Sequence, residues 1–271
     1  MSQRLVRAKS KIRDAGIPFR VPDRADLPHR LGAVLDAVYA TFAEGWLDAA
    51  GTQTRRRNLA EEGIWLGTLV VELMPGEAEA LGLLALMLHA DARRGARRDP
   101  AGEYVPLAEQ NPELWDARLT EEAEELLLRA SALGAIGRYQ LEAALQSVHA
   151  ARRHTGSTDW NAILQIYDAL AAMTQSPVVA VNQAIALSEL QGPAAGLAAL
   201  ERVAGDRRLS DYQPYWAARA ELSARAGAVD AAQAAFERAI GLETDPAVRR
   251  FLQRRLAELA RSPDVGSAPA P

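Results

Sequence analysis

The stretch that most constrains the fold is residues 138–187, which reads as three short helices in succession. Apolar residues recur at helical spacing in each part, and a polar turn at residues 154–157 separates the first helix from the second. Ser176 and Pro177 open the third helix, with Ser at the N-cap and Pro at the first helical position, where a missing N–H is harmless. Short helices of this kind depend on packing against their neighbours. The three apolar faces are Leu141, Ala144, Leu145 and Val148; Trp160, Ile163, Leu164 and Tyr167; and Val178, Val181, Ala184 and Ile185.

Helix pairs continue towards the end of the chain as an internal repeat. Residues 212–246 resemble the tetratricopeptide helix–turn–helix pattern, and an earlier copy begins at Pro177. Leu200 and Phe236 occupy equivalent places 36 positions apart, close to the ~34 residues of this repeat class. The last helix, residues 246–260, carries four arginines and is expected to be a solvated cap that ends the stack. The matching repeat positions are Trp216, Ala220, Gly227, Ala232, Phe236 and Ala239.

The first half of the chain is also predicted to be helical. Helices are expected at residues 30–45, about 55–74, 77–97 and 112–132, and the segment 99–111 is the longest interior break. The centre of the third helix, residues 81–88, is apolar nearly all round, which is typical of a buried helix. No strand signal survives, so the predicted fold class is all-α, a helical-hairpin array with tetratricopeptide-like repeats in the C-terminal part. The first helix is expected to face inward with Leu31, Val34, Leu35, Val38 and Phe42.

Charge is distributed unevenly along the 271 residues. Residues 1–24 hold seven Arg and Lys against two Asp, a net charge of +5, and the whole chain has a net charge of −4, so the remainder carries −9. The N-terminal segment, residues 1–24, is basic and the remainder of the chain is acidic, which indicates that only this segment is suited to contact nucleic acid. Within it, Arg4, Arg7, Lys9 and Lys11 lie in a predicted helix and suit contacts with phosphates.

Composition excludes several classes of protein. The chain has no cysteine, so it can form neither disulfides nor thiolate sites, and no apolar run approaches the ~18 residues of a membrane span. The N-terminus lacks the apolar core of a signal peptide. We expect a cytoplasmic protein without membrane contact.

No catalytic or metal-binding constellation emerges from the polar residues. The four histidines, at 29, 89, 149 and 154, have no ligand spacing, so no metal site and no cofactor is expected. Glu44, Asp91, Asp159 and Asp168 lie beside apolar residues, and capping or pairing with arginine explains them best. The arginine pairs 93–94 and 97–98 could hold an anion, although arginines at a helix C-terminus also complement the helix dipole. We expect no enzymatic activity.

Several long segments together resemble the C-terminal half of bacterial extracytoplasmic-function sigma factors that carry a tetratricopeptide-like extension. The similarity runs through residues 3–260 in order. The segments are QRLVRAKSKIRDAGIPFRVP, AVYATFAEGW, LGLLALMLHADARRGARRD, GRYQLEAALQSVHA, TDWNAILQIYD and SPVVAVNQAIAL.

This resemblance implies a role in promoter-specific transcription initiation. Residues 1–15 would be the remnant of the region-four recognition helix, with Arg4, Arg7, Lys9 and Lys11 facing DNA. Residues 16–28 would be a Pro-rich linker, 29–137 the first helical layer of the extension, 138–261 junction helices and repeats, and 262–271 a disordered tail. The implied partners are RNA polymerase and promoter DNA in the full-length sigma factor, and a regulatory protein on the helical repeats. The polymerase-binding region is absent, so we expect either a fragment or a descendant that keeps the extension alone.

Two alternatives remain open at this stage. The C-terminal repeat also suits a stand-alone tetratricopeptide-like scaffold that binds proteins outside transcription. A helical enzyme using Glu44, Asp91 or Asp159 is less favoured, because the sequence offers no nucleophile–base pair for it.

Overall fold

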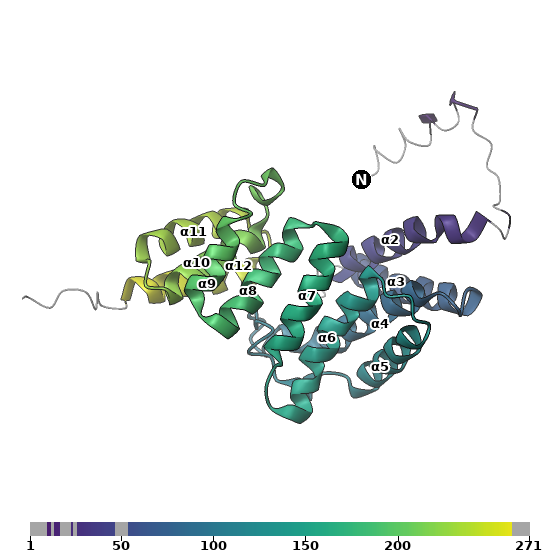
Figure 1. Ribbon diagram of the computed structural model, residues 1–271. Helices are drawn as coiled ribbons and strands as arrows, with labels where there is room; N and C mark the ends of the chain where they lie inside the picture. Colours follow the sequence, from purple (N-terminus) through teal and green to yellow (C-terminus); the bar gives the residue numbers. More distant parts are fainter. Residues whose placement is uncertain (1–9, 12–13, 17–22, 24–25, 47–53, 262–271) are drawn as a thin grey trace, which may run out of the picture. The chain divides into compact units, whose positions relative to one another are not determined.

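The computed structural model describes residues 10–11, 14–16, 23, 26–46 and 54–261 (Figure 1). The chain divides into two compact units, Met1–Ala37 and Val38–Pro271. Within the described residues every regular element is a helix, and the one pairing of β type is an isolated bridge between Arg98 and Tyr104. The all-α class is therefore confirmed.

Eleven α-helices and three short 3-10 helices make up the described part of the chain. None of these helices has the length and apolar character needed to cross a lipid bilayer. In chain order they are α2 (Leu27–Trp46), α3 (Thr54–Leu73), α4 (Ala78–Ala92), η2 (Arg94–Arg97), η3 (Pro112–Leu114), α5 (Ala117–Ala132), α6 (Arg138–Thr155), α7 (Trp160–Thr174), α8 (Pro177–Gln191), α9 (Pro193–Glu201), η4 (Arg207–Leu209), α10 (Gln213–Arg225), α11 (Val229–Leu242) and α12 (Pro246–Arg261).

Helix α4 is the buried centre of the first half, as its apolar sequence predicts. It packs against α3, α5 and α6, and every residue from Ala80 to Ala90 is buried. Its Glu79 carboxylate accepts hydrogen bonds from the backbone N–H groups of Tyr139 (3.0 Å) and Gln140 (3.2 Å), so it caps α6 from a neighbouring helix. Gly137, the N-cap residue of α6, leaves the space for this carboxylate, because a Cβ there would lie 2.2 Å from the Glu79 Cδ.

The second half contains the two predicted helix pairs, α8 with α9 and α10 with α11 (Figure 1). Val181, Leu200 and Leu222 belong to the cluster that joins the first pair to α10. Gly196 lets α9 approach α8 closely, since a Cβ there would lie 2.9 Å from the Ala184 carbonyl oxygen. The helical-hairpin array is confirmed.

Helix α12 is the last helix of the array and buries only Ala247 and Leu252, but it also makes contacts that the sequence does not predict. Arg250 and Arg254 both pair with Glu103, at 2.7 Å each, in the interior break between α4 and α5. The ring of Phe251 packs edge-on against Tyr104, with centroids 5.5 Å apart. Periodicity within one helix cannot reveal partners 147 positions away, so the sequence did not predict these contacts.

Two helix boundaries also differ from the prediction. The helix expected to run to Arg97 ends at Ala92 and continues as the 3-10 turn η2, and the helix expected from Pro112 begins at Ala117. Asp116 caps α5 by accepting from the Leu119 N–H (3.0 Å), which makes it a stronger helix-start signal than Pro112, four residues earlier. Val34 and Val178, expected to face inward, are 44% and 36% exposed.

Candidate functional site

The predicted DNA-contacting residues fall in the first unit. Arg4, Arg7 and Lys9 lie outside the described residues, and Lys11 is exposed and helical. Gly16 has a φ of 63°, the left-handed conformation that favours glycine after a helix end. Nothing further in this unit tests a DNA contact.

The main concentration of charge in the second unit lies where α4 ends. Arg93 is the C-cap residue of α4, Arg94 and Arg97 bound the 3-10 turn η2, and Arg98 follows in extended conformation. The tight turn draws these side chains together instead of spacing them along a helix. We call Arg93, Arg94, Arg97 and Arg98 the inner arginine cluster.

Three of these guanidinium groups surround the indole of Trp46, the last residue of α2. The guanidinium carbon lies 4.2 Å from the ring centroid for Arg97, 5.3 Å for Arg93 and 5.5 Å for Arg94. Arg97 also donates from Nη1 to the Trp46 carbonyl oxygen at 2.6 Å. Trp46 therefore fixes the positions of the cluster by cation–π contacts and one hydrogen bond.

The inner cluster is only half neutralised. Arg94 pairs with Asp91 (2.7 Å), and Arg98 pairs with Asp245. Within the described part of the chain, neither Arg93 nor Arg97 has a carboxylate partner, and the Nε of Arg93 is buried without an acceptor. Two positive charges thus remain uncompensated in a partly buried position.

The electrostatics of the cluster reflect this imbalance. Burial lowers the pKa of Arg93, and burial together with the charge of Arg93 lowers the pKa of Arg97 to about 10. Burial raises the pKa of Tyr39 and of Tyr104, and the positive charge of Arg93 acts in the opposite direction on both. The two hydroxyl groups therefore lie within electrostatic reach of Arg93.

A groove of about 580 Å³ continues from Tyr39 across α6, α7 and α8. Buried leucines form part of its wall, and the polar groups along it include Glu142, Gln146, Tyr167 and Asn182. Burial raises the pKa of Tyr167 to about 12, so its hydroxyl is a neutral donor at any physiological pH. The Gln146 Oε1 is buried without a donor. The groove thus combines an apolar wall with several polar groups, one of them a buried acceptor without a donor, as ligand sites do.

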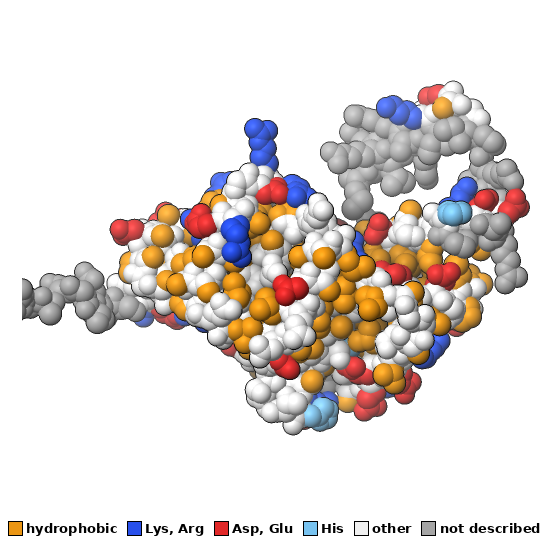
Figure 2. Space-filling model, viewed as in Figure 1, with side chains coloured by type: hydrophobic (Ala, Val, Ile, Leu, Met, Phe, Trp, Pro, Cys, Tyr) orange, Lys and Arg blue, Asp and Glu red, His pale blue; other side chains and the backbone are white. Residues whose placement is uncertain are grey.

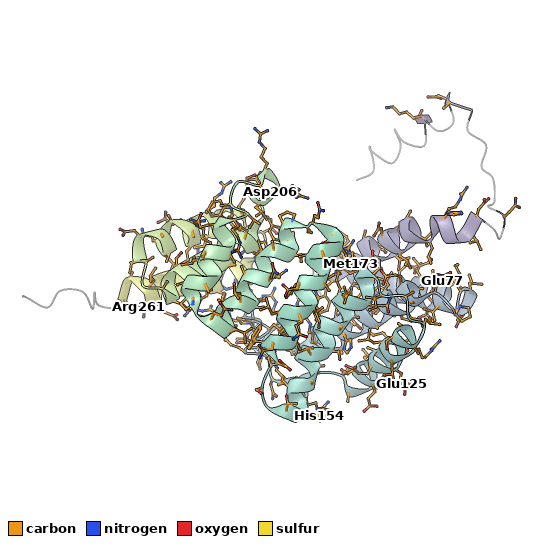
Figure 3. All side chains as sticks on the ribbon, viewed as in Figure 1. Glu77, Glu125, His154, Met173, Asp206 and Arg261 are labelled. Carbon is orange, nitrogen blue, oxygen red and sulfur yellow. The ribbon has the colours of Figure 1, made fainter. Side chains whose placement is uncertain are left out.

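A second groove, of about 620 Å³, lies between α5 and α6 and is acidic. Glu121, Glu124 and Glu125 line it, and Ser147 donates to Glu124 at 2.9 Å. Glu125 and His154 of this rim are marked in Figure 3. Figure 2 shows acidic side chains gathered over α5.

The histidines carry no metal site in the described part of the chain, where no group of three potential ligands occurs. His89 and His149 are desolvated, and burial followed by the charge of Arg93 lowers the pKa of each to about 4. His89 Nε2 lies 3.4 Å from Glu124 Oε1, but a neutral imidazole forms no ion pair there. His29 and His154 are exposed.

The carboxylates singled out in the sequence have structural partners. Asp91 pairs with Arg94 as predicted, and Asp159 caps α7 by accepting from the Ala162 N–H at 3.0 Å. Asp168 accepts from the Gln183 amide at 2.5 Å, which is neither of the predicted roles. Glu44 is partly buried near the end of α2. The structure does not gather these four into one site.

Sequence reasoning missed the aromatic half of the arginine site. Trp46 lies one residue past the helix expected at residues 30–45, and Tyr39 and Tyr104 lie in different segments, so no local pattern connects these aromatic residues with the arginines. The available signal was the arginine run itself, with four arginines in six positions and only Asp91 and Asp99 beside it.

Comparisons with known proteins give a family match over part of the chain and a similar bacterial protein. Residues 30–131 match a group described as "Family of unknown function (DUF6596)". The chain is also similar to an uncharacterized protein of Rhizobium meliloti (strain 1021), with 37% identity over 263 residues. That similarity covers 97% of this chain and 62% of the relative, so the chain spans less than two thirds of the relative's length. No solved structure matches the chain.

Proposed function

We propose that this chain is the regulatory, protein-interacting C-terminal part of a sigma factor that acts in promoter-specific transcription initiation. The proposal implies a cytoplasmic protein whose partners are RNA polymerase and promoter DNA in the complete sigma factor. The observation that carries it is the similarity along 97% of this chain to only 62% of a longer protein, which has room for further regions. The DUF6596 match is compatible with this role.

The helical array supports a regulatory role in place of a catalytic one. Stacked helix pairs present broad surfaces for partners, and the prominent carboxylates Asp91 and Asp159 are occupied by pairing and capping. The unpaired groups of the arginine cluster and of the groove are donors and acceptors suited to recognition.

A DNA-binding assay tests the role proposed for the basic N-terminal segment, residues 1–24. The chain 1–271 alone should bind DNA weakly and without sequence preference, with a log–log salt slope of about −3 to −4 if four side chains meet phosphates. Replacement of Arg4, Arg7, Lys9 and Lys11 by Gln should bring this slope close to zero. The matched control replaces four exposed arginines of the second unit by Gln: Arg118, Arg129, Arg202 and Arg208.

Tight, sequence-specific binding by the chain alone would contradict the proposal, because the recognition helix would then need no sigma scaffold. Reading the coding frame upstream of Met1 gives a second test. Sigma regions should be encoded there, and an in-frame stop close to Met1 with no such regions nearby would rule out the fragment version.

The alternative is a stand-alone tetratricopeptide-like scaffold, favoured by the two consecutive helix pairs α8–α9 and α10–α11. The two functions differ in their partner. Affinity capture from the host on the immobilised chain should retain RNA polymerase subunits under the first proposal and none under the second.

A further inference from the structure

The inner arginine cluster holds two positive charges, on Arg93 and Arg97, that no carboxylate of the described residues neutralises. Arg98, whose side chain is 11% exposed, has Asp245, and Arg94, at 21%, has Asp91. Arg93 is as close to Trp46 as Arg94 is, yet it pairs with no carboxylate of the described residues. Removing a cation from water without an anion beside it is unfavourable.

Complementarity to the dipole of α4 does not account for this arrangement. The dipole favours a cation near the helix C-terminus but requires no particular contact for the guanidinium group. Arg93 instead turns its Nε into a buried position without an acceptor, and Arg97 is held against the Trp46 ring and its carbonyl oxygen. Positions fixed by packing are a feature of sites that bind a ligand.

We propose that Arg93 and Arg97, held by Trp46 and flanked by the hydroxyls of Tyr39 and Tyr104, bind the oxyanion group of a small molecule. A guanidinium fork matches the geometry of phosphate and of carboxylate, and neutral tyrosine hydroxyls add donors to the same oxygens. The ligand is therefore a phosphate ester or a carboxylate.

The neighbouring groove provides a place for the rest of such a molecule. Tyr39 lies on the wall of this 580 Å³ groove and is seven positions before Trp46 on α2, so the two side chains share one face of that helix and α2 links the groove to the cluster. This volume lies in the range of about 300–1,000 Å³ that small-molecule sites occupy. The apolar wall and the unpaired Gln146 Oε1 suit a body with both carbon surface and a hydrogen-bond donor.

This inference goes beyond the proposed function and does not rest on it, because an oxyanion site can be present whether or not the chain acts in transcription. If the chain fails to retain RNA polymerase, the oxyanion-site proposal is unaffected. If its Tm fails to respond to oxyanions, the sigma-factor proposal is unaffected.

The test follows thermal unfolding of the chain in inorganic phosphate, glycerol phosphate and succinate, with sodium chloride at matched ionic strength as reference. A probe at about 100 times its Kd should raise Tm by about 5 °C or more. Arg93→Gln and Arg97→Gln should each abolish this rise. Arg208→Gln, an exposed arginine that pairs with Asp206 elsewhere, should keep it.

The probes also identify the ligand class. A response to the two phosphates alone assigns a phosphate ester, and a response to succinate alone assigns a carboxylate. Tyr39→Phe keeps the ring that packs on Tyr139 and removes one donor, so it should raise the Kd about tenfold without loss of fold. The proposal is overturned if no oxyanion shifts the wild-type Tm beyond the chloride reference, or if Tyr39→Phe and both arginine variants respond as the wild type does.

Discussion

Two groups of four arginines show what pairing does to the same side chain. The inner arginine cluster follows α4, and an outer cluster, Arg249, Arg250, Arg254 and Arg255, lies along α12. In the outer cluster Arg250 and Arg254 share Glu103, while Arg255 pairs with Glu221 and Glu258. In the inner cluster two of the four have no acidic partner within the described residues.

The difference separates a structural role from a recognition role. Three of the four outer arginines, Arg250, Arg254 and Arg255, are partly exposed and pair with glutamates, so they connect elements of the chain to one another. The inner arginines are drier and carry excess charge, which disturbs the groups around them. Four substitutions or changes of condition, ordered by expected effect, can break or sharpen this contrast.

Acidification should have the largest effect, through the two histidines near the inner cluster. The pKa of His89 and of His149 falls from 6.5 to about 4 on folding, so below pH 6.5 the unfolded chain takes up protons that the folded chain does not. The stability that is fully present above pH 6.5 should therefore fall by about 3 kcal/mol per histidine as the pH approaches 4. Urea unfolding between pH 7.5 and pH 4.5 measures this loss.

A histidine variant isolates the effect from other acid titrations. His149→Phe preserves an aromatic ring beside Trp160 and should remove close to half of the pH-dependent loss between pH 6.5 and 4.5. His154→Gln, at an exposed position, should leave the profile unchanged. If the free energy of unfolding depends on pH in the same way in the wild type and in both variants, His149 is solvated in the folded chain.

Loss of Asp245 should have the next largest effect. Asp245→Ala leaves Arg98 buried without a partner and removes the acceptor for the Ala247 N–H (2.9 Å) at the start of α12, so we expect about 3–4 kcal/mol of destabilisation. Asp211→Ala is the control, because Asp211 is 80% exposed and pairs with a half-exposed Arg238. Equal urea midpoints for the two variants would contradict the buried pair.

Removal of Arg93 should have a smaller effect of the opposite sign. Arg93→Met relieves the desolvation of an unpaired cation, offset in part by lost cation–π and helix-dipole attraction, and should raise the free energy of unfolding by about 1 kcal/mol. Arg94→Met leaves Asp91 unpaired and should lower the free energy of unfolding. Chemical denaturation of both variants gives the comparison, and destabilisation by Arg93→Met would identify Arg93 as a structural residue.

The outer cluster should give the smallest effect. Glu103→Gln removes the partner of Arg250 and Arg254, and both pairs are exposed enough for salt to screen them. The hydrogen bond from Arg254, with that from Arg250, lowers the pKa of Glu103, so its contribution is present at neutral pH and is lost as acid protonates the carboxylate. Any shift in the unfolding midpoint at low salt should vanish in about 0.5 M NaCl. A shift that persists at this salt concentration would show that Glu103 and its arginines contribute to stability as a shielded pair, as Asp245 and Arg98 do.

Local patterns predicted most of the fold and little of the site. Helical periodicity located the buried α4, and the repeat spacing located α8 to α11, because both signals lie within short windows. The cap of α6 by Glu79 and the pairing of Arg98 with Asp245 join residues about 60 and 147 positions apart, which no local pattern encodes. The arginine run was noted in the sequence, but its meaning depends on Trp46 and Tyr39, and only the fold brings these to it.

The contacts between α12 and the segment after α4 have a consequence for how the second unit unfolds. An open stack of helix pairs frays from its ends, and each pair contributes a separate step. Here the last helix contacts a segment from the first half of the chain. Asp245, just before α12, pairs with Arg98, and Phe251 packs against Tyr104. The terminal helix cannot detach without disturbing the interior, so residues 54–261 should lose their structure in one cooperative transition, with hydrogen exchange in α12 as slow as in α10.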